Sequence, residues 1–135
     1  MESIHATDIT IPKPDLDSPE AIHTLVNAFY DRLLNDPLMR PVFMETAGIR
    51  IEDHLPTIEA YWRKMLLGEK GSYTRNMVAK HEAVHARDPL RPEHFERWGE
   101  HFHRTLDERF SGPMTDRAHL LADRILANLQ RRLLG

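Results

Sequence analysis

The chain has 135 residues, 41% of them hydrophobic, and no cysteine, which fits one domain and excludes disulfides, thiolate nucleophiles and cysteine-ligated metal sites. The net charge of −3 and the lack of a basic stretch argue against a nucleic-acid partner, and no apolar run approaches the ~20 residues of a membrane span. We therefore expect a cytoplasmic protein with no nucleic-acid or membrane partner, in which metal ligation falls to nine histidines or to carboxylates.

The sequence predicts an N-terminal leader over residues 1–17, followed by one helical domain over residues 18–135. Pro12 and Pro14 fix φ within the leader and disfavour a helix, so we expect an extended, mobile segment. Its first residues have neither the cationic start nor the apolar core of a signal peptide.

The first predicted helix begins at Ser18-Pro19, where an N-cap hydroxyl precedes a proline at the first helical position. Apolar residues follow at spacings of three and four, until Asp36-Pro37 ends the helix. A short piece over residues 38–43 leads to a second helical stripe, formed by Leu55, Ile58, Trp62, Met65 and Leu66. Gly68 is a plausible stop for this second helix, and Pro56 is tolerable only within its first turn.

Residues 69–76 predict a loop, and a short helix that carries two histidines ends before Asp88-Pro89. Pro92 opens a third long helix, which Ser111-Gly112-Pro113 breaks. The last helix ends on Arg131-Arg132, basic residues near the negative end of its dipole. The chain shows no convincing alternating strand pattern and no internal repeat, so the predicted fold class is all-α.

Aromatic residues recur on the inward faces of the three long helices before the last one. They are Phe29-Tyr30, Tyr61-Trp62, Phe95, Trp98 and Phe102. Plain helical bundles usually fill their core with Leu, Ile and Val. The rings therefore form either a core rich in large side chains or the lining of a flat apolar cofactor.

Residues 81–85 read His-Glu-Ala-Val-His and match the H-E-x-x-H pattern of zinc proteases. On a helix the two histidines would share a face and bind Zn²⁺, with Glu82 as general base and Glu100 or Glu108 as a further ligand. The extended forms of the pattern fail, because position 88 is Asp and position 91 is Arg. The short pattern alone leaves a zinc-dependent hydrolase as an alternative function.

The order and spacing of several short patterns carry a family resemblance. They are Phe29-Tyr30, Pro41-Val42-Phe43, His54 with Trp62 eight residues later, Met65-Leu66-Leu67-Gly68-Glu69, Lys80-His81, and Phe95-x-x-Trp98-x-x-x-Phe102. From about Ser18 to its end, the chain resembles the group III truncated haemoglobins, although its loop at 69–76 and the stretch between His81 and Pro92 are longer than the family pattern. The resemblance implies a truncated globin-like two-over-two helical sandwich around a haem.

The resemblance implies haem b as the cofactor and His81 as the ligand of its iron. A neutral imidazole supplies the axial nitrogen, while its other ring nitrogen usually donates to a backbone carbonyl. His85 lies one turn further on and could compete, but the family pattern favours His81. Phe43 resembles the phenylalanine that packs on the haem face, and Ile58 and Phe95 are further expected haem contacts.

Tyr30, His54 and Trp98 resemble the distal positions, where His54 could point inward, swing to solvent or bind iron. The tyrosine hydroxyl and the indole N–H are donors, and a bond from either to negatively charged bound O₂ contributes roughly 1.5–3 kcal/mol. CO carries less charge and gains less. We therefore expect reversible binding of O₂, NO and CO, with tight O₂ retention that suits sensing or nitric oxide or peroxide chemistry with an unknown reductase.

A cofactor-free helical interaction module, whose aromatic residues are only core, is the third function that the residues leave open. The visible spectrum of the purified protein separates the three. A strong Soret band supports the haem protein, zinc without haem supports the hydrolase, and neither cofactor leaves the interaction module.

Overall fold

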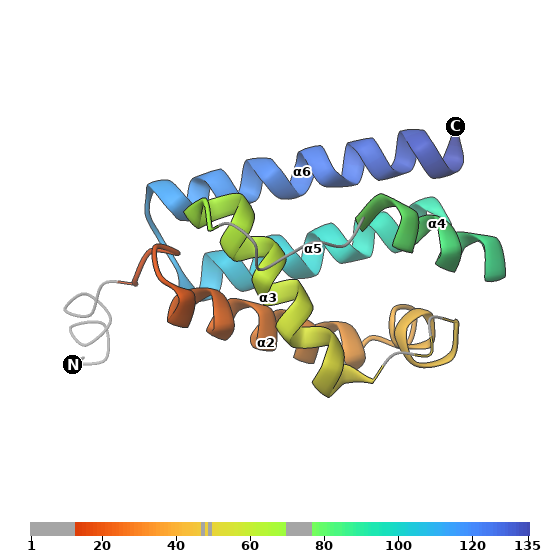
Figure 1. The fold of residues 1–135 in the computed structure, drawn as a ribbon, viewed down its shortest axis with the longest axis horizontal. Coiled ribbons are helices and arrows are strands. Elements are labelled where there is room, and N and C mark those ends of the chain that lie inside the picture. Colours follow the sequence, from red (N-terminus) through yellow and green to blue (C-terminus); the bar gives the residue numbers. More distant parts are fainter. Residues whose placement is uncertain (1–12, 47, 49, 70–76) are drawn as a thin grey trace, which may run out of the picture.

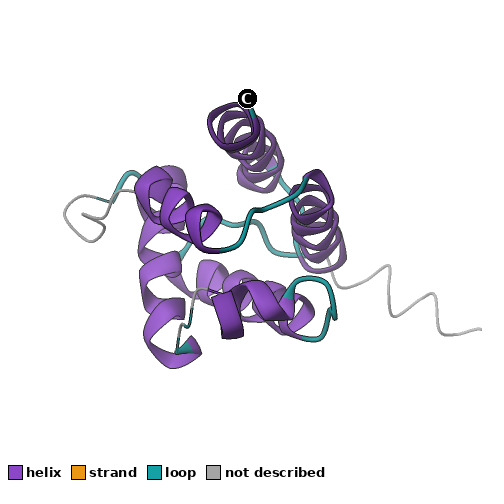
Figure 2. Ribbon diagram, turned by 90° about the vertical axis from the view of Figure 1, so that its right-hand side faces the viewer, coloured by secondary structure: helices purple, strands orange, loops and turns teal. Residues whose placement is uncertain are grey.

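The computed structural model describes residues 13–46, 48, 50–69 and 77–135, and all regular secondary structure within these ranges is helical (Figures 1 and 2). In chain order the elements are α2 (Pro19–Leu34), the short π-helical turn η1 (Val42–Thr46), α3 (Ile51–Leu67), α4 (Met77–Arg87), α5 (Pro92–Arg109) and α6 (Pro113–Leu134). The all-α prediction is confirmed. No helix in the described ranges is long and apolar enough to cross a membrane. The predicted loop at 69–76 lies outside the described residues, except for Glu69.

The long helices form two packed pairs. α2 packs against α3, α5 packs against α6, and a contact between α2 and α5 stacks one pair on the other. Figure 1 shows α5 and α6 running side by side above α2, with α3 crossing the view obliquely. The shorter α4 contacts α6 and η1. This arrangement is the two-over-two sandwich that the family resemblance implied.

The start of α2 follows the sequence signals closely. The Ser18 side chain accepts a hydrogen bond from the Ala21 backbone N–H at 3.1 Å, and Pro19 occupies the first turn. This cap satisfies one of the backbone donors that a helix start leaves without a partner. The apolar stripe of α2 is buried, as its spacing predicts: Ile22, Leu25, Val26, Phe29, Tyr30 and Leu33.

The start of α3 differs from the expectation. The helix begins at Ile51, so Pro56 lies inside it and beyond its first turn, where a proline removes the hydrogen bond to the carbonyl four residues earlier. That carbonyl belongs to Glu52, in the exposed first turn of α3, where a water molecule can donate the hydrogen bond that Pro56 cannot. At the other end Gly68 adopts the left-handed conformation with φ 71°, which confirms the predicted stop.

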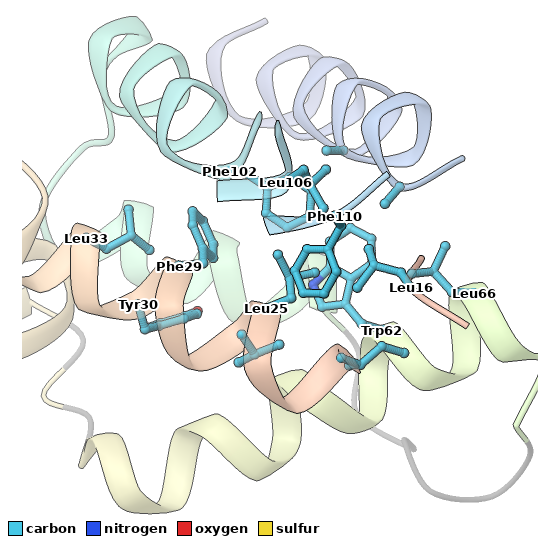
Figure 3. Close-up of a cluster of buried hydrophobic side chains, with 14 of the residues drawn as sticks. Leu16, Leu25, Phe29, Tyr30, Leu33, Trp62, Leu66, Phe102, Leu106 and Phe110 are labelled. Carbon is cyan, nitrogen blue, oxygen red and sulfur yellow. The ribbon is translucent and has the colours of Figure 1, made fainter. Parts of the chain in front are cut away.

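The main core lies where α2, α3, α5 and α6 meet (Figure 3). Its largest fully buried side chains are Phe29, Phe102, Leu16, Ile22, Leu25, Leu33 and Leu106. Leu16 belongs to the predicted leader, so packing against the core begins before residue 18. The predicted division between leader and domain stays a prediction, and residues 1–12 lie outside the described residues.

Asp15 caps the N-terminus of α6 from far away in the sequence. Its carboxylate accepts hydrogen bonds from the backbone N–H groups of Met114 and Thr115, at 3.0 and 2.7 Å, and from the Thr115 hydroxyl at 2.8 Å. Burial alone would raise the pKa of Asp15, but these bonds and one from Leu16 outweigh it and lower the pKa. Gly112 precedes α6 with φ 136°, and a Cβ there would lie 2.6 Å from the Asp15 Cγ.

Asp36 ties the end of α2 to α5. Its buried carboxylate accepts hydrogen bonds from Arg97 Nη1 at 2.7 and 2.9 Å, from His101 Nε2 at 2.7 Å, and from the Leu38 backbone N–H at 2.8 Å. Burial alone would raise the pKa of Asp36, but the bonds from His101, Leu38 and Arg97 outweigh it and lower the pKa from 3.8 to about 2.

We expect Asp36→Asn to remove part of the acid sensitivity of the fold. A carboxyl whose pKa is lowered by folding stabilises the native state above its unfolded pKa, and this contribution is lost as the pH falls from about 4 to about 2. The contribution is on the order of 2 kcal/mol at neutral pH. Urea unfolding between pH 6 and pH 2 measures it. Asp31→Asn, at an exposed position on α2, is the control, and an equal acid dependence in both variants would contradict the assignment.

Candidate functional site

A cavity of about 390 Å³ lies among side chains from all five α-helices and η1, within the size range of small-molecule and cofactor pockets. The residues that the sequence singled out all line it: Tyr30, Phe43, His54, Ile58, His81, Phe95 and Trp98. The rest of the wall is mostly apolar and includes Phe29, Met39, Val42, Trp62, Met77, Val84, Leu90, Ile125, Leu126 and Leu129. The structure thus brings the predicted residues together around one space.

His81 reaches the cavity from α4 with one ring nitrogen already occupied. Its Nδ1 donates to the Met77 carbonyl oxygen at 2.8 Å, which fixes the proton on Nδ1 and leaves a lone pair on Nε2. Burial lowers the pKa of His81, and the bond to Met77 only partly opposes this effect. The ring is therefore neutral at neutral pH, in the tautomer and protonation state that a metal ligand requires.

His85, the competing candidate on the same helix, makes a different contact. Its Nδ1 accepts a hydrogen bond from the Leu90 backbone N–H at 2.9 Å, just after α4 ends, and the residue is not part of the cavity wall. Within the described ranges, no group of three or more His, Asp or Glu side chains is arranged to hold a metal ion. The zinc-hydrolase interpretation of residues 81–85 is therefore not favoured.

Tyr30 and His54 form a polar pair in the cavity wall. The Tyr30 hydroxyl lies 3.0 Å from His54 Nε2, and the Tyr30 ring packs against those of Phe43 and His54 at centroid distances of 5.5 and 5.3 Å. Burial raises the pKa of Tyr30. The hydroxyl therefore keeps its proton at every physiological pH and remains able to donate.

Trp98 is the second donor of the wall, and aromatic contacts hold it. Its ring stacks on Phe102 at 5.1 Å and meets the edge of Phe29 at 5.0 Å. Figure 3 shows Phe29 rising from α2 towards α5, which carries Phe102. Among the described residues, no hydrogen-bond partner of the Trp98 indole N–H is found. A donor at a cavity wall with no protein partner is suited to a polar atom of a ligand.

Several lining residues were not predicted from the sequence, although the spacing of residues on α4 could have identified some of them. One face of this helix carries His81 together with Met77, Lys80 and Val84, at spacings of three and four. If His81 faces the cavity, its three neighbours on that face must face it too. Lys80 and Arg87 make this wall partly cationic. The α6 residues of the wall, such as Ile125, belong to an apolar stripe, and an apolar stripe does not distinguish core from cavity lining.

Comparison with known proteins points to one family. Residues 16–130 match the family model described as bacterial-like globin. The group 3 truncated haemoglobin ctb of Campylobacter jejuni is 30% identical over 110 residues, which cover 76% of this chain and 84% of that protein. The crystal structure of a group III truncated haemoglobin from Campylobacter jejuni superposes with a TM-score of 0.76 and 28% identity, over 86% of this chain and 91% of the other.

We expect Glu82→Gln to leave thermal unfolding, the visible spectrum and peptide hydrolysis unchanged. Glu82 is exposed on α4 and does not line the cavity, whereas a general base of a zinc protease would cost several powers of ten in rate when neutralised. Zinc content and hydrolysis of an unstructured peptide, measured for both proteins, check this. Peptidase activity that requires Glu82 would instead support the hydrolase.

Proposed function

The chain belongs to the bacterial-like globins and, within them, to the group III truncated haemoglobins, and we propose that it binds haem b in this cavity with His81 Nε2 as the iron ligand. The observation that carries the proposal is the state of His81, which lines an apolar cavity as a neutral ring with Nδ1 bonded to the Met77 carbonyl. A backbone carbonyl on the other ring nitrogen orients a metal-bound imidazole and raises its basicity. His85 has its Nδ1 engaged at the end of α4.

The remaining wall suits a flat apolar ring system with acidic side groups. Phe43, Ile58 and Phe95 supply apolar and aromatic surface that would pack on the haem and keep water away. Lys80 and Arg87 are cationic lining residues on the helix that carries His81. Their charges would pair with the haem carboxylates. The cofactor-free interaction module does not account for an apolar cavity of about 390 Å³.

Tyr30 and Trp98 would select among diatomic gases. When bound, haem supplies an iron that holds O₂, NO or CO and leaves more negative charge on O₂ than on CO. The Tyr30 hydroxyl keeps its proton, and the Trp98 N–H has no partner in the described residues, so both can donate to the charged ligand. His54 Nε2–H would donate to the Tyr30 oxygen across their 3.0 Å contact, which holds the hydroxyl in place and leaves its proton for the ligand. Such a pocket would retain O₂ rather than deliver it, which suits sensing or the turnover of nitric oxide or peroxide with a reductase as electron donor.

We expect His81→Ala to lose haem almost completely, while His85→Ala retains most of it. His85→Ala removes only the hydrogen bond to the Leu90 N–H, which contributes about 1 kcal/mol to stability. Soret absorbance per chain after gel filtration measures retention, and circular dichroism confirms that both variants fold. In His81→Gly, added imidazole should restore the Soret band. Haem loss in His85→Ala alone would reverse the assignment.

We expect Tyr30→Phe and Trp98→Phe each to speed O₂ dissociation by roughly ten-fold or more, because each variant loses one charge-assisted hydrogen bond. CO dissociation should change much less. The double variant should be non-additive, since both donors act on one ligand. Stopped-flow dissociation rates for the two gases check this.

The ratio of the O₂ and CO rates decides whether the two residues act as donors. A change in packing alone would alter both rates alike, whereas a lost donor alters mainly the O₂ rate. An unchanged ratio in both variants would reduce Tyr30 and Trp98 to core residues.

A further inference from the structure

A chain of polar side chains links α5 to α6 outside the cavity wall. The rings of His103 of α5 and His119 of α6 lie within 12° of parallel and meet edge to edge, with their centroids 4.7 Å apart and their Nδ1 atoms 2.5 Å apart. Each ring has a carboxylate at its other nitrogen. Asp123 Oδ1 lies 2.8 Å from His103 Nε2, and Asp107 Oδ1 lies 3.1 Å from His119 Nε2. We call His103 and His119 the histidine pair.

The protons of this arrangement can be assigned from its contacts. A carboxylate accepts hydrogen bonds and donates none, so Nε2 of each ring carries a proton. Two neutral rings would then point the lone pairs of their Nδ1 atoms at each other across 2.5 Å, which is repulsive. The arrangement is favourable only with a cation between the rings, either a shared proton or a metal ion.

We propose that the histidine pair is a binding site for a divalent transition metal ion of the Zn²⁺, Ni²⁺ or Cu²⁺ class. Imidazole nitrogens suit these ions, and metal-binding histidines usually donate their other N–H to a carboxylate, as both rings do here. Together with two neutral rings, the carboxylates of Asp107 and Asp123 carry a charge of −2, which a divalent ion neutralises and a single proton does not.

Metal binding requires the two rings to move apart and to tilt. Two nitrogens bound to tetrahedral zinc at ~2.0–2.1 Å lie about 3.4 Å apart, so the Nδ1 atoms must separate by roughly 0.9 Å, and the rings must tilt until both lone pairs point at the ion. The side chains of His103 and His119 are 29% and 25% exposed, so water can complete the coordination. The carboxylates of Asp107 and Asp123 accept hydrogen bonds from the Nε2 atoms and orient the rings. They are not ligands of the ion, so the protein supplies two ligands, the Nδ1 atoms.

The bound ion would join the C-terminal half of α5 to the N-terminal half of α6. An ion that binds only the folded state raises the free energy of unfolding by mass action. The unfolded chain offers no preformed site, because 16 residues separate His103 from His119 in the sequence. The site is independent of haem binding at His81, since neither member of the histidine pair lines the cavity.

Zinc titration of the purified, haem-loaded protein tests the proposal. We expect one Zn²⁺ per chain by calorimetry after treatment with a chelator, and a melting temperature that rises with zinc concentration. His103→Gln and His119→Gln should each weaken zinc binding at least ten-fold, and Asp123→Asn should weaken it by roughly ten-fold through its supporting hydrogen bond. The Soret band should not change on zinc addition.

His23→Gln is the matched control, because His23 is also a histidine with a carboxylate partner, Glu59 at 3.0 Å. Its zinc affinity should equal that of the unaltered protein. Zinc binding that survives in the double variant of the histidine pair would overturn the proposal, as would no zinc binding to the unaltered protein. The latter result would leave a shared proton as the bridging cation. Circular dichroism of each variant separates lost binding from lost folding.

Discussion

The fully buried ring of Phe102 joins three helices behind the cavity. Trp98 of α5 and Trp62 of α3 stack on it at 5.1 and 4.9 Å, and Phe29 of α2 meets it edge to face at 5.1 Å. These three neighbours line the cavity, whereas Phe102 does not. Side chains around a cavity have no packing partner on the cavity side, so contacts on their other side must fix their positions. Large aromatic rings provide such contacts, because they bury much surface and prefer defined packing geometries. The helix pairing, the cavity and the position of Trp98 all depend on this cluster.

Local signals in the sequence were sufficient for the helices and for several of their ends. Ser18 caps α2, and Gly68 ends α3 in the left-handed conformation, because these two signals depend mainly on the type of residue at the helix end. The seven expected site residues line one cavity because the family pattern carries tertiary information that periodicity lacks. An apolar face that surrounds a cavity has the same periodicity as one that packs on protein. Ile125 and Leu129 of α6 lie on such a face, and its periodicity alone does not predict a cavity wall.

Other features depend on contacts between distant segments, which no local pattern encodes. Asp15 reaches the first turn of α6 across 100 residues and supplies acceptors that Gly112 cannot. The two members of the histidine pair meet only because α5 and α6 are antiparallel neighbours. Pro56 lies further inside α3 than its backbone preference suggests, since the helix starts at Ile51 as the chain leaves η1. In each case tertiary packing outweighs local preference.

The protonation of His81 connects the stability of the fold with its chemistry. Burial lowers its pKa below the unfolded value of 6.5, so the unfolded chain takes up a proton on acidification before the folded chain does. The free energy of unfolding of the haem-free protein therefore decreases as the pH falls below that value. The same burial keeps the Nε2 lone pair available to a metal at lower pH than an exposed histidine would. A ligand that binds only the folded state offsets this loss by mass action. The histidine that weakens the empty fold in acid is thus the group through which haem would stabilise it.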